Sequence, residues 1–392
     1  MKRILGLAAL FLTIIALTGY AAQIIEIPFV PLSPVIMGQG GACIADARGY
    51  DSFFYNPAGY SRSAGAFTAL STTEWFHARP DLLLTQIWQM ATGSAGGTST
   101  LNFLNSQVTT GGLGTGAALG FGYVGDGFGL GAAFIMDSIL FGQSLLGMTG
   151  DLTATLGFMG GLSIPFDVAG MRVHAGADIR PMIRVHTPIP NSQAISVVSA
   201  LANGGSLGGA IGTATSYYGS AIALDFGVIA ELSWFTFGLS IRDLGGTTFM
   251  YTQNSFDSVT GSLGAHGTFP AGSQASDTYV IPMDIGFGVT FHPDLGDFRY
   301  FVDPRISVDL RNINGAIDGS AVFWTLLHAG AEVRLLNTFA IRAGLNQGYL
   351  TFGLGMKVLV FDMNMAVFTQ ELGVHLGDQP ASGMSFNADI RI

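Results

Sequence analysis

The sequence has little charge and only one long apolar run. Asp, Glu, Lys and Arg make up 11% of its 392 residues, less than half the share of about 25% found in soluble domains. This scarcity argues against an ordinary soluble globule. The apolar run, residues 4–17, is shorter than the roughly 20 residues that cross a bilayer as a helix. A polytopic helical membrane protein is therefore excluded.

Cysteine is almost absent, and no arrangement of residues marks an enzyme. Cys43 is the only cysteine, so no internal disulfide can form, and we expect it to be a small buried residue. The seven histidines show no metal-ligand spacing, and no Gly-x-Ser-x-Gly sequence occurs. We therefore predict no catalytic residues, no metal and no cofactor. The net charge of −10 also argues against a nucleic-acid partner.

The N-terminus has the pattern of a cleaved secretory signal. Lys2 and Arg3 precede the apolar run, and the small-x-small sequence from Gly19 to Ala21 follows it. We predict a signal peptide over residues 1–21 and an exported mature chain.

Apolar residues are nevertheless abundant, at 49%, and 56 residues are glycine. The apolar residues follow a period of two along the chain. In residues 384–392 the apolar side chains, from Met384 to Ile392, occupy the even positions, and the odd positions hold Ser385, Asn387, Asp389 and Arg391. A helix would scatter these charges around its axis. A closed transmembrane barrel, apolar outside and polar or small inside, explains both the composition and the alternation.

The repeated alternation predicts an all-β fold, an antiparallel transmembrane barrel of about 14 strands over residues 61–392. A weak fifteenth candidate, 82–91, is left out because single-chain bacterial barrels have even strand numbers. Long loops are expected at 188–220 and 244–278. The predicted strands are 64–74, 115–124, 128–137, 151–162, 171–187, 221–232, 235–243, 279–291, 299–311, 325–335, 338–346, 349–359, 361–371 and 383–392.

Residues 22–60 do not alternate, and their prolines and glycines predict a compact irregular segment. Such backbone is tolerated at membrane depth when it is buried inside a barrel. The segment resembles the N-terminal hatch, or plug, of the FadL-type outer-membrane transporters, including the PorV-like and spirochaetal branches. The residues that carry the resemblance are Gly38, Gly40, Gly41, Asp46, Asn56, Pro57, Ala58 and Gly59.

This resemblance implies a monomeric barrel closed by its hatch, which takes up long-chain fatty acids or other hydrophobic small molecules passively. The implied partners are outer-membrane lipid, a fatty-acid-like ligand and, during biogenesis, the barrel-assembly machinery. The expected location is the outer membrane. The alternative is a PorV-like scaffold or secretion-shuttle protein that transports nothing.

Two groups of residues are candidates for ligand contact. The inward face of 171–187 carries a positive ladder that could hold a carboxylate head group, or could pair with lumenal acids such as Asp225 and Glu231. Its members are Arg172, Arg180, Arg184 and His186. A short amphipathic helix predicted between Asn191 and Asn203 could capture ligand or merely pack on the rim. Its candidate residues are Ile195, Val198 and Leu201.

Overall fold

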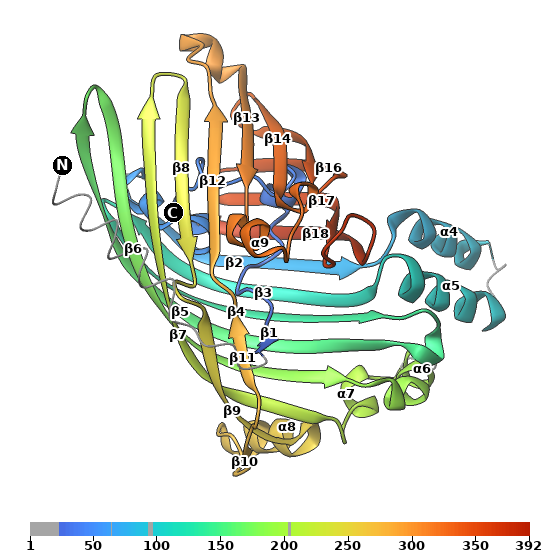
Figure 1. The fold of residues 1–392 in the computed structure, drawn as a ribbon. Helices are drawn as coiled ribbons and strands as arrows, with labels where there is room; N and C mark the ends of the chain where they lie inside the picture. Colours follow the sequence, from blue (N-terminus) through green and yellow to red (C-terminus); the bar gives the residue numbers. More distant parts are fainter. Residues whose placement is uncertain (1–22, 64, 93–96, 203–204) are drawn as a thin grey trace.

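A computed structural model describes residues 23–63, 65–92, 97–202 and 205–392 (Figure 1). The predicted signal peptide lies outside the described residues.

The wall is a closed antiparallel barrel of 14 strands, as predicted. Each strand pairs with the next along the chain, and the last pairs with the first, so that the sheet closes. Two wall strands consist of two pieces each, β8 with β9 and β12 with β11. The strands are β2 (Ala66–His77), β3 (Leu113–Gly125), β4 (Phe128–Phe141), β5 (Thr149–Val168), β6 (Met171–Ile189), β7 (Thr215–Leu232), β8 (Phe235–Arg242) with β9 (Thr247–Ser255), β11 (Thr278–Ile281) with β12 (Asp284–Phe291), β13 (Val302–Leu310), β14 (Leu327–Leu335), β15 (Phe339–Asn346), β16 (Tyr349–Val358), β17 (Phe361–Glu371) and β18 (Pro380–Arg391).

With one exception, the helical connections lie at one end of the barrel, here named the loop end. They contain α4 (Pro80–Ala91), α5 (Gly97–Thr110), η3 (Leu145–Gly147), η4 (Asn191–Gln193), α6 (Ala194–Ala202), α7 (Leu207–Ala210), α8 (Phe256–His266), α9 (Ile313–Asp318) and α10 (Phe323–Leu326). The opposite end, the turn end, has mostly tight turns. At one of them Asp126 and Gly127 have φ of 53° and 83°, as a type I′ hairpin requires. A longer connection at the turn end contains η5 (Gly296–Tyr300).

Two predicted segments can be compared directly with these elements. Residues 82–91, excluded as a strand, belong to α4. The expected loop at 244–278 is wrong, because it contains β9 and α8. In β9, Phe249 and Tyr251 are buried inside, whereas Met250 is exposed outside. Because both faces are apolar, the alternation that would have revealed this strand is hidden.

The outer surface of the wall is an apolar belt. Phe121, Leu130, Phe158, Leu224 and Phe352 are among the many large apolar side chains exposed on it. Inward positions carry glycine or buried polar groups instead. This is the alternation of a transmembrane barrel. Within the described part of the chain, no helix has the length and apolarity needed to cross a bilayer.

The N-terminal segment, residues 26–61, lies inside this barrel (dark blue in Figure 1). Its short helix α2 (Pro34–Gly38) contacts β16 and β17, and η2 (Pro57–Ser61) contacts β5, β6 and β7 across the lumen. Between them lie η1 (Gly49–Asp51) and α3 (Ser52–Tyr55). The buried rings of Phe29, Phe53 and Phe54 form a core with inward residues of the wall.

Candidate functional site

Glycines let the N-terminal segment approach the wall closely. Gly40 has a φ of 65°, and a Cβ at this position would lie 2.3 Å from the carbonyl oxygen of Ala329. A Cβ on Gly38 would lie 2.9 Å from Cα of Gly353. Any larger residue would force the segment away from the strands. Gly41 and Gly59 are similarly crowded, by His328 and by Ser52.

Asn56 organises the second half of the segment. Its Oδ1 accepts from the backbone N–H of Ala58 at 3.1 Å, which caps the helix begun by Pro57. Its Nδ2 donates to the carbonyl oxygens of Ile44 and of Leu239 in β8, at 3.1 and 3.2 Å. One buried amide therefore joins two parts of the segment to the wall.

Charged groups hold the rest of the N-terminal segment against the wall. The carboxylate of Asp46 pairs with Arg48 and, at 3.1 Å, with Arg305 of β13. Burial alone would raise the pKa of Asp46, but these guanidinium groups outweigh it and hold that pKa below its ordinary range. Asp309 Oδ2 accepts from the backbone N–H groups of Cys43 and Ile44 at 2.6 and 2.8 Å.

Most members of the positive ladder have carboxylate partners in the structure. Arg180 is fully buried and pairs with Asp225 at 3.0 Å and Asp243 at 2.9 Å. Pairing with Asp225 was one of the two alternatives that the sequence left open. Arg172, at the turn end, is exposed and stands opposite Glu231 in register.

Arg184 and His186 pair with Glu26, a residue that the sequence analysis did not single out. Arg184 Nη1 lies 2.9 Å from Glu26 Oε2. His186 Nδ1 lies 2.7 Å from Glu26 Oε1, and its Nε2 lies 2.9 Å from Asp151 Oδ1. The sequence offered one indication of this role, since Glu26 is the only acidic residue between residues 22 and 45.

The predicted amphipathic helix is present as α6 and packs on the barrel rim. Ala194 and Val197 are buried against Leu140, Met148 and Ile189, and Val198 packs beside them. Ile195 is 72% exposed and points away from this cluster. The side chain of Leu201 lies outside the described residues.

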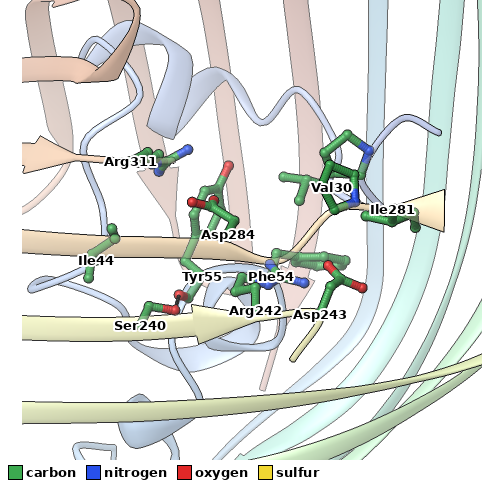
Figure 2. Close-up of a pocket in the computed structure, with 13 residues that line it drawn as sticks. Val30, Ile44, Phe54, Tyr55, Ser240, Arg242, Asp243, Ile281, Asp284 and Arg311 are labelled. Carbon is green, nitrogen blue, oxygen red and sulfur yellow. Dashed lines mark hydrogen bonds between the residues drawn. The ribbon is translucent and has the colours of Figure 1, made fainter. Parts of the chain in front are cut away.

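A cavity of about 50 Å³ lies between the N-terminal segment and the wall (Figure 2). This volume holds a few water molecules or one small polar group. The lining residues come from the N-terminal segment, from β8, β11 and β12, and from the chain next to them: Pro28, Val30, Ile44, Phe54, Tyr55, Ser240, Arg242, Asp243, Ile281, Pro282, Asp284, Gly286 and Arg311.

The cavity combines hydrogen-bond donors with an apolar wall. Arg242 is 7% exposed, and neither of its Nη atoms has a hydrogen-bond partner among the described residues, although Nη2 lies 3.5 Å from Asp225. The hydroxyl of Tyr55 and the Nε of Arg311 are also without partners there. Unpaired buried donors are costly, so a ligand that supplies acceptor atoms would be favoured at this position. Val30, Phe54 and Ile281 form the apolar side.

The two neighbouring wall strands are interrupted beside this cavity. The ladder pairs Asp284 with Arg242 and then Ile281 with Thr247, so 243–246 and 282–283 lie unpaired between these positions. Asp243, Gly245 and Gly246 all have positive φ. In the sequence, Arg242 stands directly before the run Asp-Leu-Gly-Gly. This run could have predicted that the strand is interrupted after Arg242.

No group of three or more His, Cys, Asp or Glu residues in the described part of the chain is placed to hold a metal ion.

No protein-family model and no curated protein matches the chain. Solved structures similar to it include the Pseudomonas putida toluene transporter TodX, with 12% identity over 94% of this chain and 99% of TodX and a TM-score of 0.46. The Ralstonia pickettii toluene transporter TbuX is 14% identical over 92% of this chain and 98% of its own, also with a TM-score of 0.46. The Salmonella typhi outer membrane phospholipase matches 84% of this chain and 90% of its own at 10% identity, with a TM-score of 0.25.

Proposed function

We propose that this protein is an outer-membrane channel for the passive uptake of hydrophobic small molecules, long-chain fatty acids among them, with the N-terminal segment as its hatch. The observation that carries the proposal is the cavity behind the interrupted strands. There, donors of Arg242 and Tyr55 that have no hydrogen-bond partner among the described residues face an apolar wall. A molecule with a small polar head and an apolar body matches this chemistry. No bond is made or broken during passage.

Capture would begin at the loop end, which in this orientation faces outward because outer-membrane barrels have their long loops outside. Trp88 of α4 and Ile195 of α6 are exposed there and offer apolar surface to a ligand. Ile195 is the exposed member of the proposed capture surface, whereas Val198 packs against the rim. Partition into the lumen follows, and a shift of the hatch releases the ligand inward or through the wall.

The proposed head-group position depends on which guanidinium groups keep N–H donors without a hydrogen-bond partner among the described residues. Arg180 and Arg184 are already neutralised by Asp225, Asp243 and Glu26. Moving them onto a ligand would leave buried carboxylates uncompensated, which is costly. Arg242 is held less tightly, because its Nη2 lies 3.5 Å from Asp225 and neither Nη atom has a hydrogen-bond partner among the described residues. We therefore propose that it receives the head.

Uptake of labelled oleate by cells that carry or lack the protein tests this function. We expect faster uptake in the cells that carry it. Equal uptake, together with failed secretion of a surface protein in the cells that lack it, would instead support the PorV-like scaffold. A signal-peptide-bearing barrel of unrelated type, expressed at the same level, controls for general permeability.

A further inference from the structure

The barrel wall is much shorter on one side than on the other. On the short side, which comprises β14 to β17, the strands β15 and β16 have 8 and 10 residues, whereas β5 and β6 have 20 and 19. At about 3.3 Å per residue and a tilt near 40°, ten residues span roughly 25 Å. This height is less than the hydrocarbon core of about 30 Å, so a bilayer has to thin beside the short side.

The hairpin tips of the short side are apolar. Leu336 lies in the turn between β14 and β15, and Leu359 and Val360 lie in the turn between β16 and β17. Their side chains are 46%, 87% and 38% exposed. Turns that face water are usually built from glycine, asparagine, aspartate or serine. These tips therefore suit contact with lipid at the edge of the hydrocarbon core.

An apolar furrow of about 600 Å³ crosses the outer face of the short side. It runs between two rows of outward side chains, and its floor is formed by Ala340 and Gly355, which are paired and have almost no side chain. The two rows are Phe339, Met356 and Met363, and Ile341, Leu354 and Met365. Half of these side chains are methionines, which adapt their shape to an irregular apolar guest.

Lys357 stands at the turn-end rim of the furrow, directly after Met356. It is the only lysine in residues 4–392 and is exposed. The acid opposite it in register, Asp362, lies 3.7 Å from Arg391 instead. Among the described residues, no carboxylate forms an ion pair with Lys357, so its charge is available to an anionic group.

Arg334 adds positive charge to the same rim, and its side chain is 39% exposed. Its Nε lies 2.7 Å from Glu332, but Arg342 also lies 2.7 Å from that carboxylate, and Arg305 lies 3.9 Å from it. The small pocket on the lumenal side of the rim is lined by three basic residues and one acidic residue. A positive rim beside an apolar furrow is complementary to a molecule with a phosphate group and an apolar body.

We propose that the furrow binds one phospholipid of the leaflet at the turn end, with an acyl chain between the two rows and the phosphate against Lys357 and Arg334. By alternation, both basic side chains begin on the lumenal face of the wall. They are long enough for their charged ends to reach the head-group layer around the short turns. The site does not depend on the proposed function, because it lies outside the wall and uses no residue of the cavity.

Native mass spectrometry of the folded, delipidated protein in detergent tests this site. Palmitoyl-oleoyl phosphatidylglycerol is titrated, and dioleoylglycerol, which has no phosphate, is titrated in parallel. We expect the first phosphatidylglycerol to bind about tenfold more tightly than any later one, and dioleoylglycerol to show no such first step. Equal affinity at every step of the phosphatidylglycerol titration would overturn the proposal.

Two substitutions test the head-group and acyl-chain contacts separately. Lys357→Gln should weaken the first binding step about tenfold, whereas Arg172→Gln, on the long side of the wall, should not. Met363→Trp fills the furrow and keeps the outer face apolar, and Leu224→Trp in β7 is its control.

Heat-modifiable migration confirms that each variant is folded, and Lys357→Gln, at an exposed position, decides the test on its own. Binding by Lys357→Gln that equals binding by Arg172→Gln would overturn the phospholipid site. A stable dimer that Met363→Trp abolishes would also overturn it, because the furrow would then be an interface with a second copy of the chain.

Discussion

Nη1 of Arg184 lies 2.9 Å from Oε2 of Glu26, and both side chains are 1% exposed. This pair links β6 of the wall to the first residues of the N-terminal segment. His186 and Tyr251 complete the surroundings of the carboxylate. The positive ladder therefore holds the segment in place at this end, and its strength can be measured by removing one partner.

Glu26→Gln should loosen the N-terminal segment. The substitution leaves Arg184 buried without its counter-charge, and breaking a buried pair in this way typically costs about 3–5 kcal/mol. In planar bilayers we expect more frequent and larger conductance steps than in the unmodified protein. Asp297→Asn, which neutralises an exposed acid at the turn end, serves as the matched control. Identical traces for the Glu26 variant and the control would show that Glu26 does not hold the segment in place.

Acidification should loosen the N-terminal segment of the unmodified protein, as Glu26→Gln does at neutral pH. Burial alone would raise the pKa of Glu26, but the hydrogen bond and charge of His186, with the charge of Arg184, hold it below the ordinary value. A lowered pKa means that the stabilisation is fully present above about pH 4.3, the ordinary glutamate value, and is lost as the pH falls through the folded value.

Conductance recorded from pH 7 down to pH 3 checks this expectation. The unmodified protein should stay closed at pH 5 and begin to open only below about pH 4.3, as Glu26 is protonated between Arg184, His186 and Tyr251. Asp151 faces the other side of His186, with its Oδ1 2.9 Å from Nε2. The Glu26→Gln variant should open to a similar extent at pH 7 and pH 5. A transition near neutral pH would point to another group.

The barrel could be predicted from the sequence because its signal is repeated. Alternation in each strand is weak, yet fourteen strands share it. β9 escaped detection because apolar residues occupy both of its faces, with Tyr251 inside and Met250 outside.

The cavity could not be predicted in this way. It depends on how the N-terminal segment lies against two wall strands whose ladder is interrupted beside it, and no local pattern indicates that contact. The partners of Arg184 were hidden for the same reason, since Glu26 is 158 residues away in the chain.

Deletion of residues 24–58 should open the lumen. This stretch includes α2, η1 and α3, whose buried side chains fill the space between opposite parts of the wall. Without it, inward polar groups such as Arg305, Arg342 and Glu332 would line a wet channel, and we expect a several-fold rise in ion conductance. A folded barrel, checked by its heat-modifiable migration, is required for the comparison. Unchanged conductance in a folded barrel would remove the plug assignment.

Arg242→Gln should weaken the binding of ligands that carry a carboxylate. Hydrogen bonds to charged groups contribute about 1.5–3 kcal/mol, so we expect oleate affinity to fall by roughly tenfold to a hundredfold. The affinity for methyl oleate, which has no charge to lose, should change little. Arg172→Gln, an exposed arginine at the turn end, is the control for overall charge. Titration calorimetry in detergent measures both ligands with the unmodified protein and with each of the two variants. Equal losses for acid and ester in Arg242→Gln would show that Arg242 supports the fold of the cavity instead of receiving the head group.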